Sequence, residues 1–173
     1  MNNYKAMDIA NYIISYVNKD QESPLGGLTP LKLQKILYYV ATTYLKRHGE
    51  LLFLEPFRKW QYGPVVREVY SEFKSVGINH ISKPKSLIIH DANAPFGRRR
   101  KEFDEDMFVD DAYFKEVANS VIDTLITSTA FELVEITHQE SAWSNCEPEI
   151  LSGESDLRYS LEELHQAKNI LTS

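Results

Sequence analysis

Two stretches of this chain pair a glutamate with a histidine at a spacing that places both side chains on one face of a helix. They are Glu135 with His138 and Glu162 with His165, both in the pattern E-x-x-H. Helix bundles that bind two iron ions use two such pairs and add one glutamate from each of two further long helices. The first two helices predicted along this chain contain no glutamate. Chance spacing among solvated charges therefore explains the motifs better, and we predict no metal and no other cofactor.

The single cysteine, Cys146, lies eight residues after His138. A thiol beside an imidazole can act as a nucleophile, but Pro148 and the polar residues before it disfavour the straight helix that would align the pair. A half-buried packing thiol is the better interpretation. Sequence motifs of nucleotide-binding loops, serine hydrolases and zinc proteases do not occur either. We therefore predict no enzymatic activity, and catalysis by Glu135, His138 and Cys146 is the least supported alternative.

A run of four basic residues, Arg98 to Lys101, is followed directly by the acidic stretch EFDED. Opposite charges this close largely cancel beyond a Debye length of about 8 Å, so a solvated loop is the simplest interpretation. The alternatives are a loop that docks a protein partner and, less favoured, one that binds nucleic acid. The formal net charge of the chain is -6, which argues against a general binder of the phosphate backbone.

The composition predicts one globular domain. Of the 173 residues, 43% are hydrophobic and 12% are aromatic, which is enough for one core. No stretch approaches the roughly 20 apolar residues of a membrane span, and the N-terminus lacks the pattern of a secretory signal. With one cysteine and therefore no internal disulfide, a reducing, cytoplasmic location is expected.

Hydrophobic periodicity and helix-end signals predict a mainly α fold: a single compact helical domain with a loop-rich insertion and room for a small β-hairpin. The loop-rich third spans 78–110 and contains a candidate strand at 87–89. Helices are predicted over 6–19, 30–48, 64–76, 111–126, 131–140 and 160–171.

The helix over 30–48 has the clearest end signals. Thr29 is a good N-cap, Pro30 fits the first helical position because its missing N–H costs nothing there, and Gly49 stands where a C-terminal cap belongs. A broad apolar stripe between these ends predicts that this is the central core helix.

Two lysines of the same helix, Lys32 and Lys35, fall outside the stripe and are expected on a wet face, with their stems lying along apolar surface. Tyr38 and Tyr39 are nearby. Because tyrosine is enriched at binding hot spots, a partner-contact surface is the sharper hypothesis for this face.

The stretch WQYGPVV begins at Trp60 and leads into the helix over 64–76. Pro64 is predicted at the first helical position, and Tyr70 is predicted to face inward. Trp60 and Tyr62 are expected to pack this corner against the central helix. Nothing in the stretch supplies a base or a nucleophile.

Taken together, these stretches resemble the Panacea domain, the SocA-like antitoxin family with phage-associated members of the GepA type. The resemblance rests on LQKILYY from Leu33, on GELLF from Gly49, on Glu55, on W-x-Y-G-P-V from Trp60 with the following V-Y, and on T-H-x-x-x-x-W ending at Trp143. It implies a Panacea-like domain over 1–151, which leaves 152–173 as a C-terminal helical extension.

The resemblance implies a bacterial antitoxin rather than an enzyme. Family members neutralise a cognate protein toxin by binding it, and SocA-type members act as proteolytic adaptors that deliver a toxin to a ClpXP-type protease. The basic run keeps one alternative open, a nucleic-acid-binding regulator of its own operon. No membrane partner is expected.

Two sets of residues follow from these arguments. The predicted partner-binding residues are Lys32, Lys35, Tyr39, Arg67, Arg98, Arg99 and Arg100. The predicted structural motif residues are Leu33, Gln34, Tyr38, Trp60, Tyr62, Gly63, Pro64, His138 and Trp143.

Overall fold

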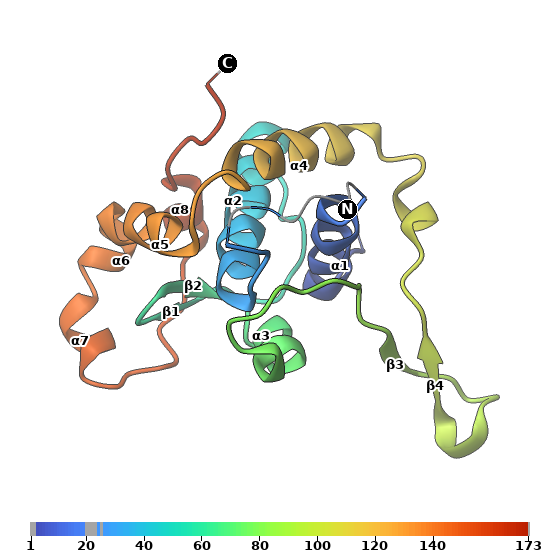
Figure 1. Ribbon diagram of the computed structural model, residues 1–173. Coiled ribbons are helices and arrows are strands. Elements are labelled where there is room, and N and C mark those ends of the chain that lie inside the picture. Colours follow the sequence, from blue (N-terminus) through green and yellow to red (C-terminus); the bar gives the residue numbers. More distant parts are fainter. Residues whose placement is uncertain (1–2, 20–23, 25, 173) are drawn as a thin grey trace.

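The computed structural model of the chain describes residues 3–19, 24 and 26–172, and within these ranges the fold is mainly α, as predicted (Figure 1). The helices are α1 (Ala6–Val17), α2 (Pro30–His48), α3 (Arg67–Phe73), α4 (Ala112–Leu125), α5 (Ala130–Gln139), α6 (Ser141–Ser144), α7 (Glu147–Leu151) and α8 (Leu161–His165). The strands are β1 (Arg58–Trp60), β2 (Gly63–Val65), β3 (Leu87–His90) and β4 (Arg98–Lys101). None of the described helices is long and apolar enough to cross a membrane.

Helix α2 is the centre of the molecule, which confirms the prediction for this segment. The Thr29 hydroxyl accepts a hydrogen bond from the Lys32 N–H, Pro30 occupies the first turn, and Gly49 closes the helix at φ 82°. Every residue over 32–45 is buried. Helices α1, α4, α5 and α8 all pack against α2, so no side of it remains wet.

The remaining predicted helices are confirmed with shifted ends. Asp111 caps α4 by accepting from the Phe114 N–H. Ser160 and Glu163 form the predicted capping box of the last helix, in which each side chain accepts from the other residue's backbone N–H. That helix ends at His165, several residues earlier than expected.

The segment around Pro64 differs from the prediction. Pro64 lies in strand β2 opposite Lys59 of β1, and α3 begins three residues later at Arg67. The cause is tertiary: the side chain of Gln34 binds both the N–H and the C=O of Val66 and so holds this backbone extended. Tyr70, predicted to face inward, is 41% exposed.

The loop-rich insertion contains the predicted small hairpin. The strand expected at 87–89 extends to His90 and pairs antiparallel with Arg98–Lys101. The basic run is therefore a strand and not a loop, which corrects the simplest sequence interpretation. In Figure 1 this hairpin projects away from the helical body.

The described part of the segment after residue 152 returns to the body of the molecule. The Lys59 N–H donates to the Leu157 carbonyl at 2.7 Å, and the Tyr159 N–H donates to the Phe57 carbonyl at 2.9 Å. Tyr159 and Ala167 are buried, and α8 packs on α2. The segment thus adds a third extended stretch beside β1.

Candidate functional site

The family-motif residues of α2 hold the β1–β2 hairpin by its backbone. The Gln34 amide donates to the Val66 carbonyl at 3.2 Å and accepts from the Val66 N–H at 3.0 Å. The next residue, Lys35, donates from its ammonium to the Pro64 carbonyl at 2.8 Å. All of these groups are buried, so each contact satisfies a polar atom that water does not reach.

The helices α5 and α6 hold the same hairpin from its other end. The Trp143 indole N–H donates to the Trp60 carbonyl at 2.8 Å, and His138 Nε2 donates to the Gln61 carbonyl at 2.9 Å. The two rings stack with their centroids 3.6 Å apart. Burial lowers the pKa of His138 and so favours the neutral ring, and the contact with a carbonyl oxygen requires a proton on Nε2. We call Gln34, Lys35, His138 and Trp143 the hairpin clamp.

The turn of this hairpin requires a glycine. Gly63 adopts φ 95°, in the region that side chains disfavour. A Cβ at this position would lie 2.5 Å from the Thr137 hydroxyl oxygen and 3.1 Å from Lys35 Cε. The clamp therefore closes around a turn with no room for a side chain.

Lys32 and Lys35 are not on a wet face, which corrects the prediction. They are 1% and 0% exposed, because α2 is covered on all sides. The Lys32 ammonium donates to the Ile126 carbonyl at the end of α4, at 2.8 Å. Burial lowers the pKa of Lys35 to about 7. In the folded protein neither lysine presents a surface to a partner, and both instead bind backbone carbonyls.

Tyr39 is buried as well, so it does not lie on an exposed face of α2, and its role in partner binding stays a prediction. The hydroxyls of Tyr38 and Tyr39 donate to the two carboxylate oxygens of Glu140, at 2.8 and 2.7 Å. The N–H of Lys168 donates to the same carboxylate at 2.9 Å. Burial, together with the Glu140 charge, raises the pKa of both tyrosines. This contact joins α2 to the α5–α6 junction and to the C-terminal segment.

The residues that could do chemistry do not converge. His138 belongs to the hairpin clamp, and the half-buried Cys146 instead lies 3.4 Å from the Lys59 ammonium, which also binds Glu163 at 2.6 Å. Within the described ranges, no group of three or more His, Cys, Asp or Glu side chains is placed to hold a metal ion. The E-x-x-H motif at Glu135 therefore positions a hairpin and leaves its glutamate on the surface.

The aromatic residues of the β1–β2 turn face outward. Trp60 is half-buried and packs against the ring of Tyr70 at 5.0 Å, while its indole N–H donates to the Ser155 carbonyl. Tyr62 is 50% exposed and packs against Phe131. Neither ring packs this corner against α2 as predicted, because the clamp residues already fill that side.

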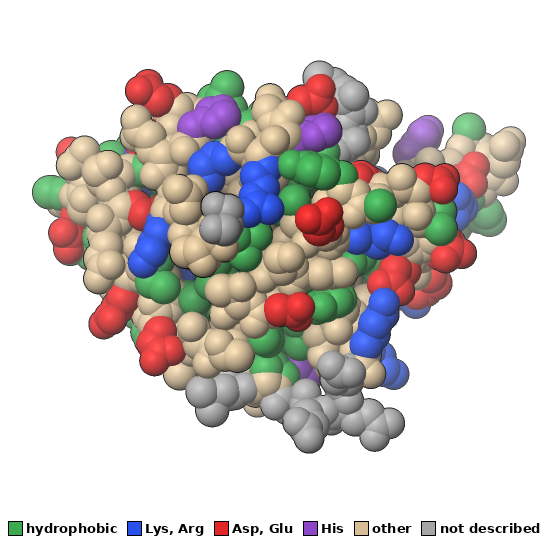
Figure 2. All heavy atoms as spheres, turned by 90° about the horizontal axis from the view of Figure 1, so that it is seen from above, with side chains coloured by type: hydrophobic (Ala, Val, Ile, Leu, Met, Phe, Trp, Pro, Cys, Tyr) green, Lys and Arg blue, Asp and Glu red, His purple; other side chains and the backbone are tan. Residues whose placement is uncertain are grey.

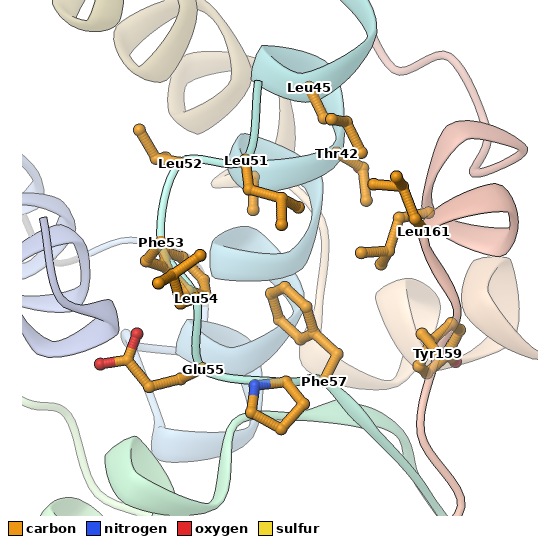
Figure 3. Close-up of a pocket in the computed structure, with 13 residues that line it drawn as sticks. Thr42, Leu45, Leu51, Leu52, Phe53, Leu54, Glu55, Phe57, Tyr159 and Leu161 are labelled. Atoms are coloured by element: carbon orange, nitrogen blue, oxygen red, sulfur yellow. The ribbon is translucent and has the colours of Figure 1, made fainter. Parts of the chain in front are cut away.

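An open pocket of about 150 Å³ lies beside α2 (Figure 3). Its floor is α2, one wall is the segment 51–57, and the opposite wall is Tyr159 with α8. Three leucines on its walls are unusually exposed: Leu51 at 37%, Leu54 at 76% and Leu161 at 54%. Glu55 also lines the pocket, and its carboxylate accepts a hydrogen bond from the Ala6 N–H. The pocket is thus largely apolar and open to solvent.

Sequence reasoning missed this pocket and also missed Glu140. The signal for the pocket is weak but present, since ELLFLEPF is strongly apolar for a stretch without helical or alternating periodicity. Elsewhere the surface is mixed: Figure 2 shows acidic and basic side chains scattered among one another on the face seen from above.

One family model matches the chain. Its description is "Antitoxin SocA-like, Panacea domain", and the match covers residues 33–144, from the start of the LQKILYY stretch to the residue after Trp143. The matched region contains all four residues of the hairpin clamp and one wall of the pocket. No curated protein and no solved structure matches the chain.

Proposed function

Since the chain belongs to the SocA-like antitoxin family with the Panacea domain, we propose that it neutralises its cognate toxin by binding it directly, in the cytoplasm and without catalysis. The observation that supports this proposal is the leucine-lined pocket beside α2. We propose that the pocket receives one or two apolar side chains of the toxin.

The exposed leucines support a binding role because the fold does not need them. Leu54 is 76% exposed and Leu161 is 54% exposed, so their side chains contribute little to the core. Burying such side chains in a complex contributes about 1–2 kcal/mol each. Apolar side chains that converge on one concave opening are typical of interaction sites, whereas single scattered ones are not.

The experiment is co-expression with the product of the neighbouring gene as the candidate toxin. The variants Leu54→Asp and Leu161→Asp should keep the fold but weaken the complex by about tenfold or more, because each places a charge in an apolar contact. Growth rescue and co-purification measure the effect. The matched control is Ile78→Asp, since Ile78 is 91% exposed and does not line the pocket.

One outcome would contradict toxin neutralisation itself, and another would contradict only the choice of the pocket as the binding surface. If the wild-type protein neither rescues growth nor co-purifies with the neighbouring product, direct neutralisation of that toxin is wrong. If the wild type works and the two pocket variants match Ile78→Asp, the toxin binds another surface.

The same strains separate occlusion from delivery to a protease. An adaptor should shorten the half-life of the toxin only in cells that contain a ClpXP-type protease. Simple occlusion should leave the amount of toxin unchanged while activity is lost.

A further inference from the structure

The segment 83–101 concentrates positive charge within an acidic chain. It contains six lysines and arginines but a single acidic residue, Asp91, whereas the whole chain has a formal net charge of -6. This segment includes β3, β4 and the turn between them, and we call it the arm. In Figure 1 the β3–β4 part of the arm stands clear of the helices.

The two faces of the arm differ. Cross-strand partners share a face, so Arg98 with His90 and Arg100 with Ile88 lie together on one side. Arg99 points to the other side and pairs with Asp91 at 2.9 Å. Among the described residues, Arg98 and Arg100 have no ion-pair partner, and both are exposed. One face thus presents two guanidinium groups without a described ion-pair partner, from residues whose Cα atoms are roughly 7 Å apart along the strand.

The tip of the arm presents an aromatic ring. Phe96 is 100% exposed and adopts φ 60°, which makes it the one non-glycine residue with positive φ in the described chain. A bulky side chain in this conformation is strained, and strain of this kind is found where structure serves binding. Pro95 precedes it. The hairpin therefore ends in a turn that exposes a large apolar side chain.

We propose that the arm binds the phosphate backbone of duplex DNA, with Arg98 and Arg100 on phosphates and Phe96 at the tip. A two-stranded ribbon fits a major groove about 12 Å wide. Ile88, on the cationic face, is suited to contact a thymine methyl group.

The geometry favours DNA over an acidic protein. A stable protein interface buries about 800 Å² on each partner, which needs a broad surface. The free face of the arm offers one exposed aliphatic residue, Ile88, between charged groups. The acidic remainder of the chain repels DNA, so only the arm should approach it, and binding should be weak and strongly dependent on salt. This inference does not depend on the proposed toxin binding.

The experiment measures fluorescence anisotropy of a labelled duplex of about 20 base pairs, titrated with the full chain at about 50 and 150 mM salt. Wild type should bind in the micromolar range at the lower salt. Arg98→Ala and Arg100→Ala should each weaken binding about fivefold and reduce the salt slope by about one. Arg99→Ala is the matched control and should change affinity less than twofold, although it removes the same charge. Phe96→Ala should weaken binding without changing the salt slope.

The proposal is overturned if wild type does not bind the duplex at about 50 mM salt. It is also overturned if Arg99→Ala weakens binding as much as its neighbours do, because the face would then not matter. Polyglutamate serves as a second probe: if it competes as well as unlabelled duplex, the arm recognises acidic protein and not DNA. Since all these side chains are exposed, circular dichroism should confirm an unchanged fold for every variant.

Discussion

Both hairpins of this molecule consist of two antiparallel strands, but their surroundings are opposite. β1 and β2 are almost wholly buried, and four side chains from α2, α5 and α6 bind backbone groups in and beside them. β4 is exposed along its entire length, and β3 is exposed at every second residue. The first hairpin is thus part of the core, whereas the second depends on its own ladder and on a few contacts at its base.

This contrast shows what the family motif does. Its polar and aromatic residues form the hairpin clamp, in which Gln34, Lys35, His138 and Trp143 bind backbone groups in and beside the β1–β2 hairpin. Because these side chains bind backbone groups of the fold, we expect the surfaces that contact partners to lie elsewhere. The arm has no such constraint, so its side chains are free to serve binding.

The largest effect should come from opening the clamp at Trp143. Trp143 is 3% exposed, so Trp143→Ala should lower the free energy of unfolding by about 3–5 kcal/mol, through lost burial and an unpaired Trp60 carbonyl. Trp60→Ala is the matched control. Because that ring is half-buried, its loss should cost only about 1–2 kcal/mol. Urea unfolding measures both, and equal losses would contradict the assignment of the clamp to Trp143.

One substitution can be compared directly between the hairpins. Gly63→Ala should cost about 2–4 kcal/mol, since the new Cβ meets the Thr137 hydroxyl at φ 95°. Gly97→Ala, at φ 69° with only ordinary contacts to His90, should cost about 1 kcal/mol. Thermal unfolding of the two variants tests the comparison. A larger loss at Gly97 would mean that the arm, and not the clamped turn, is the more constrained hairpin.

The third prediction is that the stability of the fold depends on pH because of Lys35. Burial lowers its pKa from 10.5 to about 7 in the folded protein. Above pH 7 the folded protein therefore releases a proton that the unfolded chain keeps, and stability rises with pH up to the unfolded value. Between pH 7 and about 9 the free energy of unfolding should rise by about 2 kcal/mol because of Lys35. Below pH 7 Lys35 is protonated in both states and no longer changes the free energy of unfolding with pH.

The control for this prediction is Lys35→Met, which keeps the volume of the side chain but has no group to titrate. The difference in unfolding free energy between wild type and this variant should change with pH, while contributions from groups that do not interact with Lys35 cancel. Measurements should stay below about pH 9.5, because the raised pKa values of Tyr38 and Tyr39 make stability fall as the unfolded tyrosines ionise. A constant difference from pH 7 to 9 would contradict the low pKa.

The helices could be predicted because their signals are local. Thr29 and Gly49 mark the ends of α2 through contacts within one turn, and the Ser160–Glu163 capping box does the same for α8. The start of α3 could not be predicted in this way. Pro64 is compatible with a first helical turn and with a strand, and the choice depends on Gln34, which lies thirty residues earlier in the chain.

The prediction that Lys32 and Lys35 are exposed was wrong for a related reason. Helical periodicity places Lys32 and Lys35 off the apolar stripe, and an isolated helix would leave both in water. In the folded protein, α4 and the β1–β2 hairpin cover that side and supply carbonyls to the ammonium groups. Whether a lysine is exposed to solvent depends on the elements that pack over it, and hydrophobic periodicity within one helix does not predict these elements.

By itself, the sequence determined the helical class, both ends and the central place of α2, and the resemblance to the SocA-like antitoxins, because each depends on neighbouring residues or on a contiguous motif. Only the tertiary structure decided that the motif residues form a clamp, that three leucines line a pocket, and that Arg99 forms an ion pair while Arg98 and Arg100 form none with any described residue. Those features arise from contacts between segments far apart in the chain, and burial and charge pairing are properties of such contacts.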